Sequence, residues 1–188
     1  MLPKDKKIIV ATIKLFATEG VSVATAKIAE EAGVSNGSLF NYFASKQILI
    51  DEVYLQIKTE IADSILSDVA EVKTLQKFLF SLWSSYILWA IANPVKYKVV
   101  HLLKASQVIS PDATNRTEEI FKVANQKIGQ GIADGQIVNI PLDYYCDLVS
   151  SQLMAAISYL KSQNLRGKAL KEHISNSFEI YWNGIIKR

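Results

Sequence analysis

The stretch "AEEAGVSNGSLFNYFASK", residues Ala29 to Lys46, decides which fold this chain adopts. It contains GVSNG at positions 33–37, a G-x-S-x-G pattern. In α/β-hydrolases this pattern forms a nucleophile elbow, in which a strand turns sharply into a helix and exposes the serine hydroxyl. The same pattern also fits the turn between two DNA-binding helices.

The residues before the pattern favour the second interpretation. They read "AKIAEEA" at positions 26–32, with helical spacing and helix-forming composition, whereas a nucleophile elbow needs a strand there. A hydrolase also needs a histidine and an acid beside its serine. His101 and His173 are present, but nothing in their surroundings marks either one. We therefore expect a helix-turn-helix and no catalytic residue.

Each residue of the turn has a physical role in a helix-turn-helix. Gly33 lies where the second helix stops and reverses, which favours a positive φ and therefore glycine. Ser35 can cap the third helix by accepting a backbone N–H. Gly37 costs about 1 kcal/mol inside a helix relative to alanine, but it lets the backbone approach a phosphate. The apolar Leu39 and Phe43 are expected to face the module's core.

The segment Ile8 to Leu49 resembles the N-terminal domain of the TetR family of bacterial transcriptional regulators. Family members carry A-x-x-L-F-x-x-x-G, then I-A-x-x-A-G-V-S-x-G-[TS]-L-[YF]-x-Y-F-x-S-K-x-x-L. This chain keeps that spacing, with Thr12 in place of the first alanine. Phe40 stands where many members carry tyrosine, so a phosphate-binding hydroxyl is missing and we expect Phe40 to pack. The segment between Gly20 and Ile28 is one residue shorter than usual, which blurs the assignment of Thr25.

The resemblance implies a homodimer that places two recognition helices in successive major grooves of operator DNA, ~34–36 Å apart. The expected phosphate contacts are Thr25, Lys27, the N–H of Gly37, Tyr42 and Lys46. Asn36, Ser38 and Asn41 are the expected base readers, while Ser35 is a cap first. The alternatives are that Lys27 and Lys46 are solvated surface and that Tyr42 packs against the fourth helix.

The rest of the chain also shows helical spacing and no alternating β pattern, so the predicted fold class is all-α with about nine helices. One of these is expected to run from Ser110-Pro111 to Asp134-Gly135. We predict a DNA-binding domain at residues 1–46 and an effector-binding and dimerisation bundle at residues 47–188.

Composition excludes several other classes. The 188 residues are 49% apolar and 21% charged, as in globular proteins, and the net charge of +3 does not by itself imply nucleic acid. The single Cys146 fits a reducing compartment, so a cytoplasmic protein is expected. No local cluster of metal ligands exists, and we expect no cofactor. The uncharged stretch from Phe78 to Val95 contains serines and a proline, so a buried core helix is a better interpretation than a membrane span.

Two further roles follow from the resemblance. Dimerisation is assigned to apolar stripes on the last two predicted helices, although the same stripes can also fill the monomer core; they consist of Leu148, Gln152, Ala156, Tyr159, Phe178, Tyr181, Trp182 and Ile185. A small, largely apolar effector is expected beside an aromatic cluster, which can equally be core; it consists of Trp83, Tyr86, Trp89, Tyr97, His101 and Phe121.

The sequence therefore predicts a ligand-responsive transcriptional regulator, with repression relieved by the effector as the first hypothesis. The alternative is an enzyme or small-molecule-binding protein that retains a vestigial helix-turn-helix.

Overall fold

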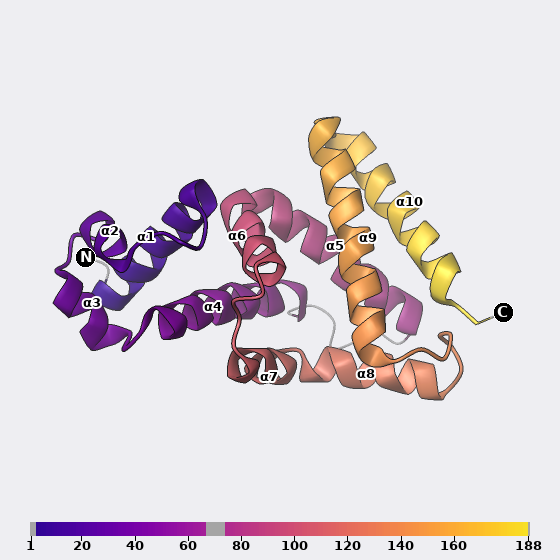
Figure 1. The fold of residues 1–188 in the computed structure, drawn as a ribbon. Helices are drawn as coiled ribbons and strands as arrows, with labels where there is room; N and C mark the ends of the chain where they lie inside the picture. Colours follow the sequence, from indigo (N-terminus) through magenta and orange to yellow (C-terminus); the bar gives the residue numbers. More distant parts are fainter. Residues whose placement is uncertain (1–2, 67–73, 188) are drawn as a thin grey trace. The chain divides into compact units, whose positions relative to one another are not determined.

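The computed structural model describes residues 3–66 and 74–187, and in these ranges the chain forms helices and no strand (Figure 1). The expected all-α class is confirmed. The ten described helices are α1 (Lys4–Glu19), α2 (Thr25–Glu31), α3 (Asn36–Tyr42), α4 (Lys46–Leu66), α5 (Leu75–Ala92), α6 (Pro94–Ala105), α7 (Pro111–Ile120), α8 (Lys122–Ala133), α9 (Leu142–Ser162) and α10 (Gly167–Ile185).

One predicted helix is in fact two. The segment expected to run unbroken from Pro111 to Asp134 is interrupted at Phe121, where φ is −99° and ψ is 10°. These angles lie in the sparsely populated bridge region rather than in the helical region. The residues around Phe121 include no proline, and the nearest glycine is Gly129, so no local turn signal indicates this break.

The helices divide into two compact units, which we describe separately. Unit 1 comprises Met1–Glu60 and Asn93–Ile120, so it combines α1 to α3 and most of α4 with α6 and α7. Unit 2 comprises Ile61–Ala92 and Phe121–Arg188. Helices α6 and α7 therefore belong to the same unit as α1 to α3, although they lie far away in the sequence.

Unit 1 is built around α1, which packs against α2, α3 and α6. Its core consists of apolar side chains at helical spacing, including Ile8 and Phe16 of α1, Ile28 of α2 and Leu39 of α3. Thr12, the residue that replaces the family's alanine, is also fully buried. Its hydroxyl donates to the Ile8 carbonyl at 2.7 Å, so no polar group is left unsatisfied there.

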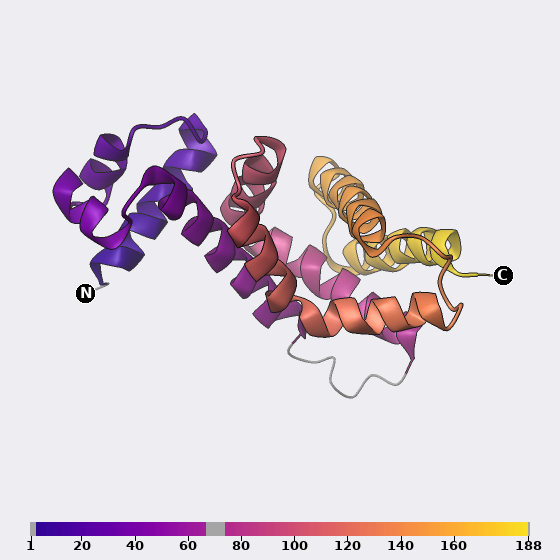
Figure 2. The same cartoon turned by 60° about the horizontal axis from the view of Figure 1, so that its bottom comes forward.

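Unit 2 is built around α5, which packs against α8, α9 and α10. Helices α9 and α10 lie side by side in both ribbon views (Figures 1 and 2). Trp83 lies at the centre of this unit, where its ring stacks on that of Tyr181 with 5.0 Å between centroids. The indole N–H of Trp83 donates to the Ser177 hydroxyl at 3.1 Å, so the polar end of this buried side chain is satisfied.

The loop after α8 closes unit 2 at the end of α10. Ile137 and Ile186 form an isolated antiparallel bridge, and the N–H of Val138 donates to the Ile185 carbonyl at 2.8 Å.

Helix α8 approaches α5 closely at Gly131, where a Cβ would lie 2.4 Å from Cδ2 of Leu75. A side chain at position 131 would therefore force the Leu75 side chain to shift.

No single helix among residues 3–66 and 74–187 combines the length and the apolar character that crossing a membrane requires.

Candidate nucleic-acid interface

The turn between α2 and α3 is a Schellman motif. Gly33 has a φ of +67°, as the sequence predicted. Its N–H donates to the Glu30 carbonyl at 3.0 Å, and the N–H of Val34 donates to the Ala29 carbonyl at 2.9 Å. These two bonds satisfy carbonyls at the end of α2 and reverse the chain direction. The turn thus fixes the angle at which the chain enters α3.

Serine caps fix the start of α3 and the start of α4. The Ser35 hydroxyl accepts a hydrogen bond from the Ser38 N–H at 3.1 Å, which confirms Ser35 as the N-cap of α3. The Ser45 hydroxyl accepts one from the Ile48 N–H at 3.2 Å and caps α4 in the same way. Both caps satisfy N–H groups that the helices themselves leave free.

Helix α3 has one buried and one exposed face. Leu39 is completely buried and Phe43 nearly so, as predicted. Asn36, Gly37 and Asn41 are exposed, and Ser38 is half-buried. The exposed face therefore offers side-chain amides and backbone groups, which is the arrangement that base and phosphate contacts need.

The prediction that Phe40 packs inside the module is wrong. Its side chain is 38% exposed and lies on the same side of α3 as Asn36, one helical turn earlier. The missing hydroxyl had suggested a purely structural role. Helical spacing alone gives the correct answer, because Phe40 follows the buried Leu39 by one position and therefore points about 100° away from it.

Nothing among residues 3–66 and 74–187 requires glycine at position 37. A Cβ built on Gly37 would meet no atom within 4 Å, and its φ is not positive. Glycine is nevertheless costly inside a helix. The absence of a side chain at this exposed position thus has no internal packing reason, which fits the close external approach expected from the sequence.

The expected phosphate contacts lie at helix starts and on the surface. Thr25 is the first residue of α2 and is half-buried, while Tyr42 at the end of α3 is 49% exposed rather than packed inside. The Lys27 ammonium pairs with Glu19 at 2.7 Å, an exposed ion pair of little energetic weight that a phosphate can replace. Lys46, the first residue of α4, is half-buried and has no ion pair within residues 3–66 and 74–187.

Four of the residues predicted to form a dimer interface lie instead in the core of unit 2. Phe178, Tyr181 and Ile185 of α10 and Ala156 of α9 are buried against their own chain and leave almost no surface for a second one. These four residues therefore fill the core of their own chain, which was the alternative interpretation for the stripes. Trp182 is half-exposed and stacks on Phe178, and Leu148 and Gln152 are half-buried.

The exposed apolar residues of α9 and α10 were missed by the sequence analysis, apart from Tyr159. Ile180 of α10 is 72% exposed, and Tyr144, Met154 and Tyr159 of α9 are about half exposed. The Tyr159 ring lies 5.2 Å from that of His173, whose Nε2 is 2.9 Å from the Ala156 carbonyl. This contact brings the exposed sides of the two helices together.

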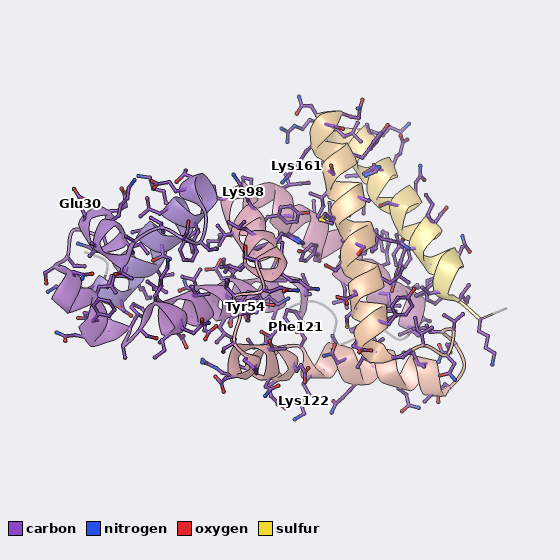
Figure 3. All side chains as sticks on the ribbon, viewed as in Figure 1. Glu30, Tyr54, Lys98, Phe121, Lys122 and Lys161 are labelled. Carbon is purple, nitrogen blue, oxygen red and sulfur yellow. The ribbon has the colours of Figure 1, made fainter. Side chains whose placement is uncertain are left out.

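The residues of the predicted aromatic cluster are divided between the two units. Trp83 is core, and Tyr86 lies 5.9 Å from Trp89, both on α5 of unit 2. In unit 1, Tyr97 lies 4.5 Å from His101, and burial raises the pKa of Tyr97. Phe121 is half-buried at the junction of α7 and α8 (Figure 3). An open groove of about 560 Å³ between α4 and α7 of unit 1 is lined by none of these residues.

Comparisons with known proteins agree with this geometry. Residues 8–53 match the sequence profile of the family described as bacterial regulatory proteins, tetR family. The crystal structure of a protein assigned to the tetR family of transcription regulators, from Shewanella sp. PV-4, is 30% identical, with 100% of both chains covered and a TM-score of 0.91.

Two more distant structures share the fold. A TetR family transcription regulator from Marinobacter aquaeolei VT8 is 21% identical, covers 98% of this chain and 96% of its own, and gives a TM-score of 0.87. The transcriptional regulator FadR from Bacillus subtilis, in complex with stearoyl-CoA, is 18% identical, covers 96% of this chain and 98% of its own, and gives a TM-score of 0.72.

Proposed function

The chain belongs to the TetR family of bacterial regulatory proteins and carries that family's DNA-binding helix-turn-helix, and from this premise we propose that it is a dimeric operator-binding repressor released by a small, largely apolar effector. The observation that carries the proposal is the exposed face of α3. It presents amide side chains and an open glycine on a helix whose start is fixed by the Ser35 cap.

In this proposal α3 enters the major groove and α2 and α4 contact the flanking phosphates. The DNA phosphates are bound by the N–H of Gly37, the Tyr42 hydroxyl and the Lys46 ammonium. These contacts do not depend on the base sequence. Thr25 and Lys27 supply further phosphate contacts at the start of α2. Each cation adds to the salt dependence of binding, because it releases counterions from the DNA.

Sequence discrimination comes from the exposed residues of α3. Asn36 and Asn41 can each bond the N6 and N7 atoms of adenine in a bidentate pair, worth about 1–3 kcal/mol. Ser38 can bond either a base or a phosphate. The exposed ring of Phe40 can contact the C5-methyl of thymine, a contact open to an apolar side chain. Since residues 3–46 contain no arginine, we expect an operator half-site rich in A·T pairs.

The dimer surface in this proposal is the exposed side of α9 and α10. Ile180, Tyr159 and Tyr144 supply apolar area, and Gly184 leaves open space in which a partner helix can approach. A two-fold axis makes such a surface self-complementary, so each residue is used twice. In the proposed interface these residues take the place of Phe178, Tyr181 and Ile185, which are buried in the core of their own chain.

The proposed effector is chosen by the chemistry of α5, which carries Lys77 as its single charged residue, near its first turn, and is rich in aromatic side chains. The B. subtilis FadR neighbour is in complex with stearoyl-CoA, whose acyl chain is long and apolar, so compounds with long acyl chains are the first to test. An effector relieves repression only if it binds the free dimer more tightly than the DNA-bound dimer.

A randomised-duplex selection tests the proposal. The purified chain should enrich a palindromic site, bind it in a mobility-shift assay, and release it on addition of the effector. The rival function is an enzyme or ligand-binding protein with a vestigial module. A protein with that function would enrich no sequence in the selection. At each salt concentration it would bind all duplexes weakly and with the same affinity.

A further inference from the structure

The first turn of α4 is joined to the loop between α6 and α7 by side-chain hydrogen bonds. The Gln47 amide donates to the Val108 carbonyl at 2.8 Å and to Oδ1 of Asp51 at 3.0 Å. The same carboxylate oxygen accepts the backbone N–H of Ser110 at 3.1 Å. Asp51 is therefore the point at which the start of α4 meets the start of α7, and all four residues belong to unit 1.

Ser110 is the N-cap of α7, because its hydroxyl accepts the Ala113 N–H at 3.1 Å. In a capping box, an acidic or amide side chain three residues after the cap bonds the cap's own N–H. That position in α7 is Ala113, which has no acceptor and is completely buried. Asp51 supplies the missing acceptor from another helix, and its negative charge is also favourable at the N-terminus of α7.

Further contacts extend the junction along both helices. The Arg116 guanidinium pairs with Glu52 at 2.9 Å. Next to this pair, the hydroxyl of Tyr54 on α4, labelled in Figure 3, lies close to the side chain of Thr117 on α7. Helix α7 thus follows α4 over two turns, and the contact begins next to Lys46, the first residue of α4 and the proposed phosphate contact.

We propose that Asp51, by completing the N-cap of α7, is a positioning residue for DNA binding: it locks the first turn of α4, and with it Lys46, in the orientation that contacts phosphate. This rests on the proposed function. Because linkage is reciprocal, DNA held by Lys46 must in turn stabilise the Asp51–Ser110 bond and the start of α7.

The sign of one substitution separates positioning from simple charge. Removing a carboxylate near DNA strengthens binding electrostatically, whereas removing a positioning contact weakens it. Asp51→Ala should weaken binding to the selected duplex by about tenfold, the effect of one charge-assisted hydrogen bond. Asp51→Asn keeps an acceptor oxygen with the same loss of charge and should retain affinity. Asp63→Ala, which removes an exposed acid on the same helix, is the matched control and should not weaken binding.

Hydrogen exchange provides a second measurement. If Asp51 had only a structural role, DNA would not change the exchange rates of the amides at the start of α7. Duplex DNA should slow exchange of the Ser110 and Ala113 amides in the unaltered dimer and in Asp51→Asn, but not in Asp51→Ala. Gln47→Ala changes an exposed position and should also weaken DNA binding, by a smaller factor. This variant replaces Asp51→Ala in the test if Asp51→Ala does not fold. The inference is overturned if the dimer binds DNA yet Asp51→Ala or Gln47→Ala binds as tightly, or if DNA leaves those amides unchanged. If the unaltered dimer binds no duplex, the proposed function fails as well.

Discussion

The Ser35 hydroxyl accepts the Ser38 N–H at 3.1 Å, so the cap of α3 is made by a residue one position before the helix and closes on its first turn. With the Schellman turn at Gly33, this bond fixes both the direction and the starting point of the helix proposed to read bases. A helix of seven residues is too short to be stable by itself, so these terminal bonds carry much of its order.

Replacement of the cap should therefore weaken both folding and DNA binding. We expect Ser35→Ala to lower the free energy of unfolding by about 1 kcal/mol. Ser35→Thr keeps the hydroxyl and is the control. Urea unfolding measures the first effect and a mobility-shift titration the second. Equal stability of the alanine and threonine variants would mean that the cap bond is not formed in solution.

Lys46→Ala should weaken binding to every duplex alike. The slope of log K against log salt should become shallower by about 1, because one phosphate contact is lost. Lys77→Ala removes an exposed lysine from α5 in unit 2 and should leave the slope unchanged. Fluorescence-anisotropy titrations at four salt concentrations give the slopes. An unaltered slope in Lys46→Ala removes this residue from the contact surface.

Phe40 should read a thymine methyl group. Replacing that thymine by uracil in the selected duplex removes only the methyl group and should cost the unaltered protein about 1 kcal/mol. Phe40→Ala should bind the two duplexes equally, whereas Phe40→Leu should keep part of the difference. If no thymine-to-uracil exchange in the half-site changes affinity, Phe40 makes no such contact.

Ile180→Asp should dissociate the dimer. A carboxylate in the centre of an apolar interface should raise the dimer dissociation constant by about two orders of magnitude. Val123→Asp is a matched control, since Val123 on α8 is 66% exposed but lies outside the proposed surface. Sedimentation velocity distinguishes the two variants. Identical behaviour of both would place the interface elsewhere.

The core of unit 2 should lose stability in alkali. Burial raises the pKa of Tyr145 to about 12 from 10.0, and burial also raises that of Tyr181, its hydrogen-bonding partner. Because the folded-state pKa lies above the unfolded value, the contribution to stability is complete below pH 10 and is lost as pH rises towards about 12. For Tyr145 this contribution is about 3 kcal/mol. In urea unfolding between pH 8 and pH 11, Tyr145→Phe should lose less stability than the unaltered chain.

Local signals in the sequence were sufficient for the DNA-binding helices. Gly33, Ser35, Leu39 and Phe43 behave as predicted, because turn chemistry and capping depend on neighbours in the chain. The break at Phe121 was not predictable in this way, since it follows from no local turn residue.

The burial of four of the eight predicted dimer residues could not be foreseen for a different reason. An apolar stripe reveals that a helix face is covered but not whether its own chain or a partner covers it. In α10 the side chains of Phe178 and Tyr181 pack on α5, whereas Ile180, between them in sequence, is 72% exposed. The bond from Asp51 to Ser110 joins residues far apart in sequence, and no periodic pattern indicates it.

The packing of α6 on α1 and of α7 on α4 also limits how hybrid regulators can be assembled. A chimera that exchanges only residues 1–46 with another regulator would pair a foreign α1 with the native α6, and would place a foreign segment directly before Gln47. Successful chimeras should instead transfer residues 93–120 together with residues 1–60, so that the transferred α1 to α4 keep their own α6 and α7 as packing partners.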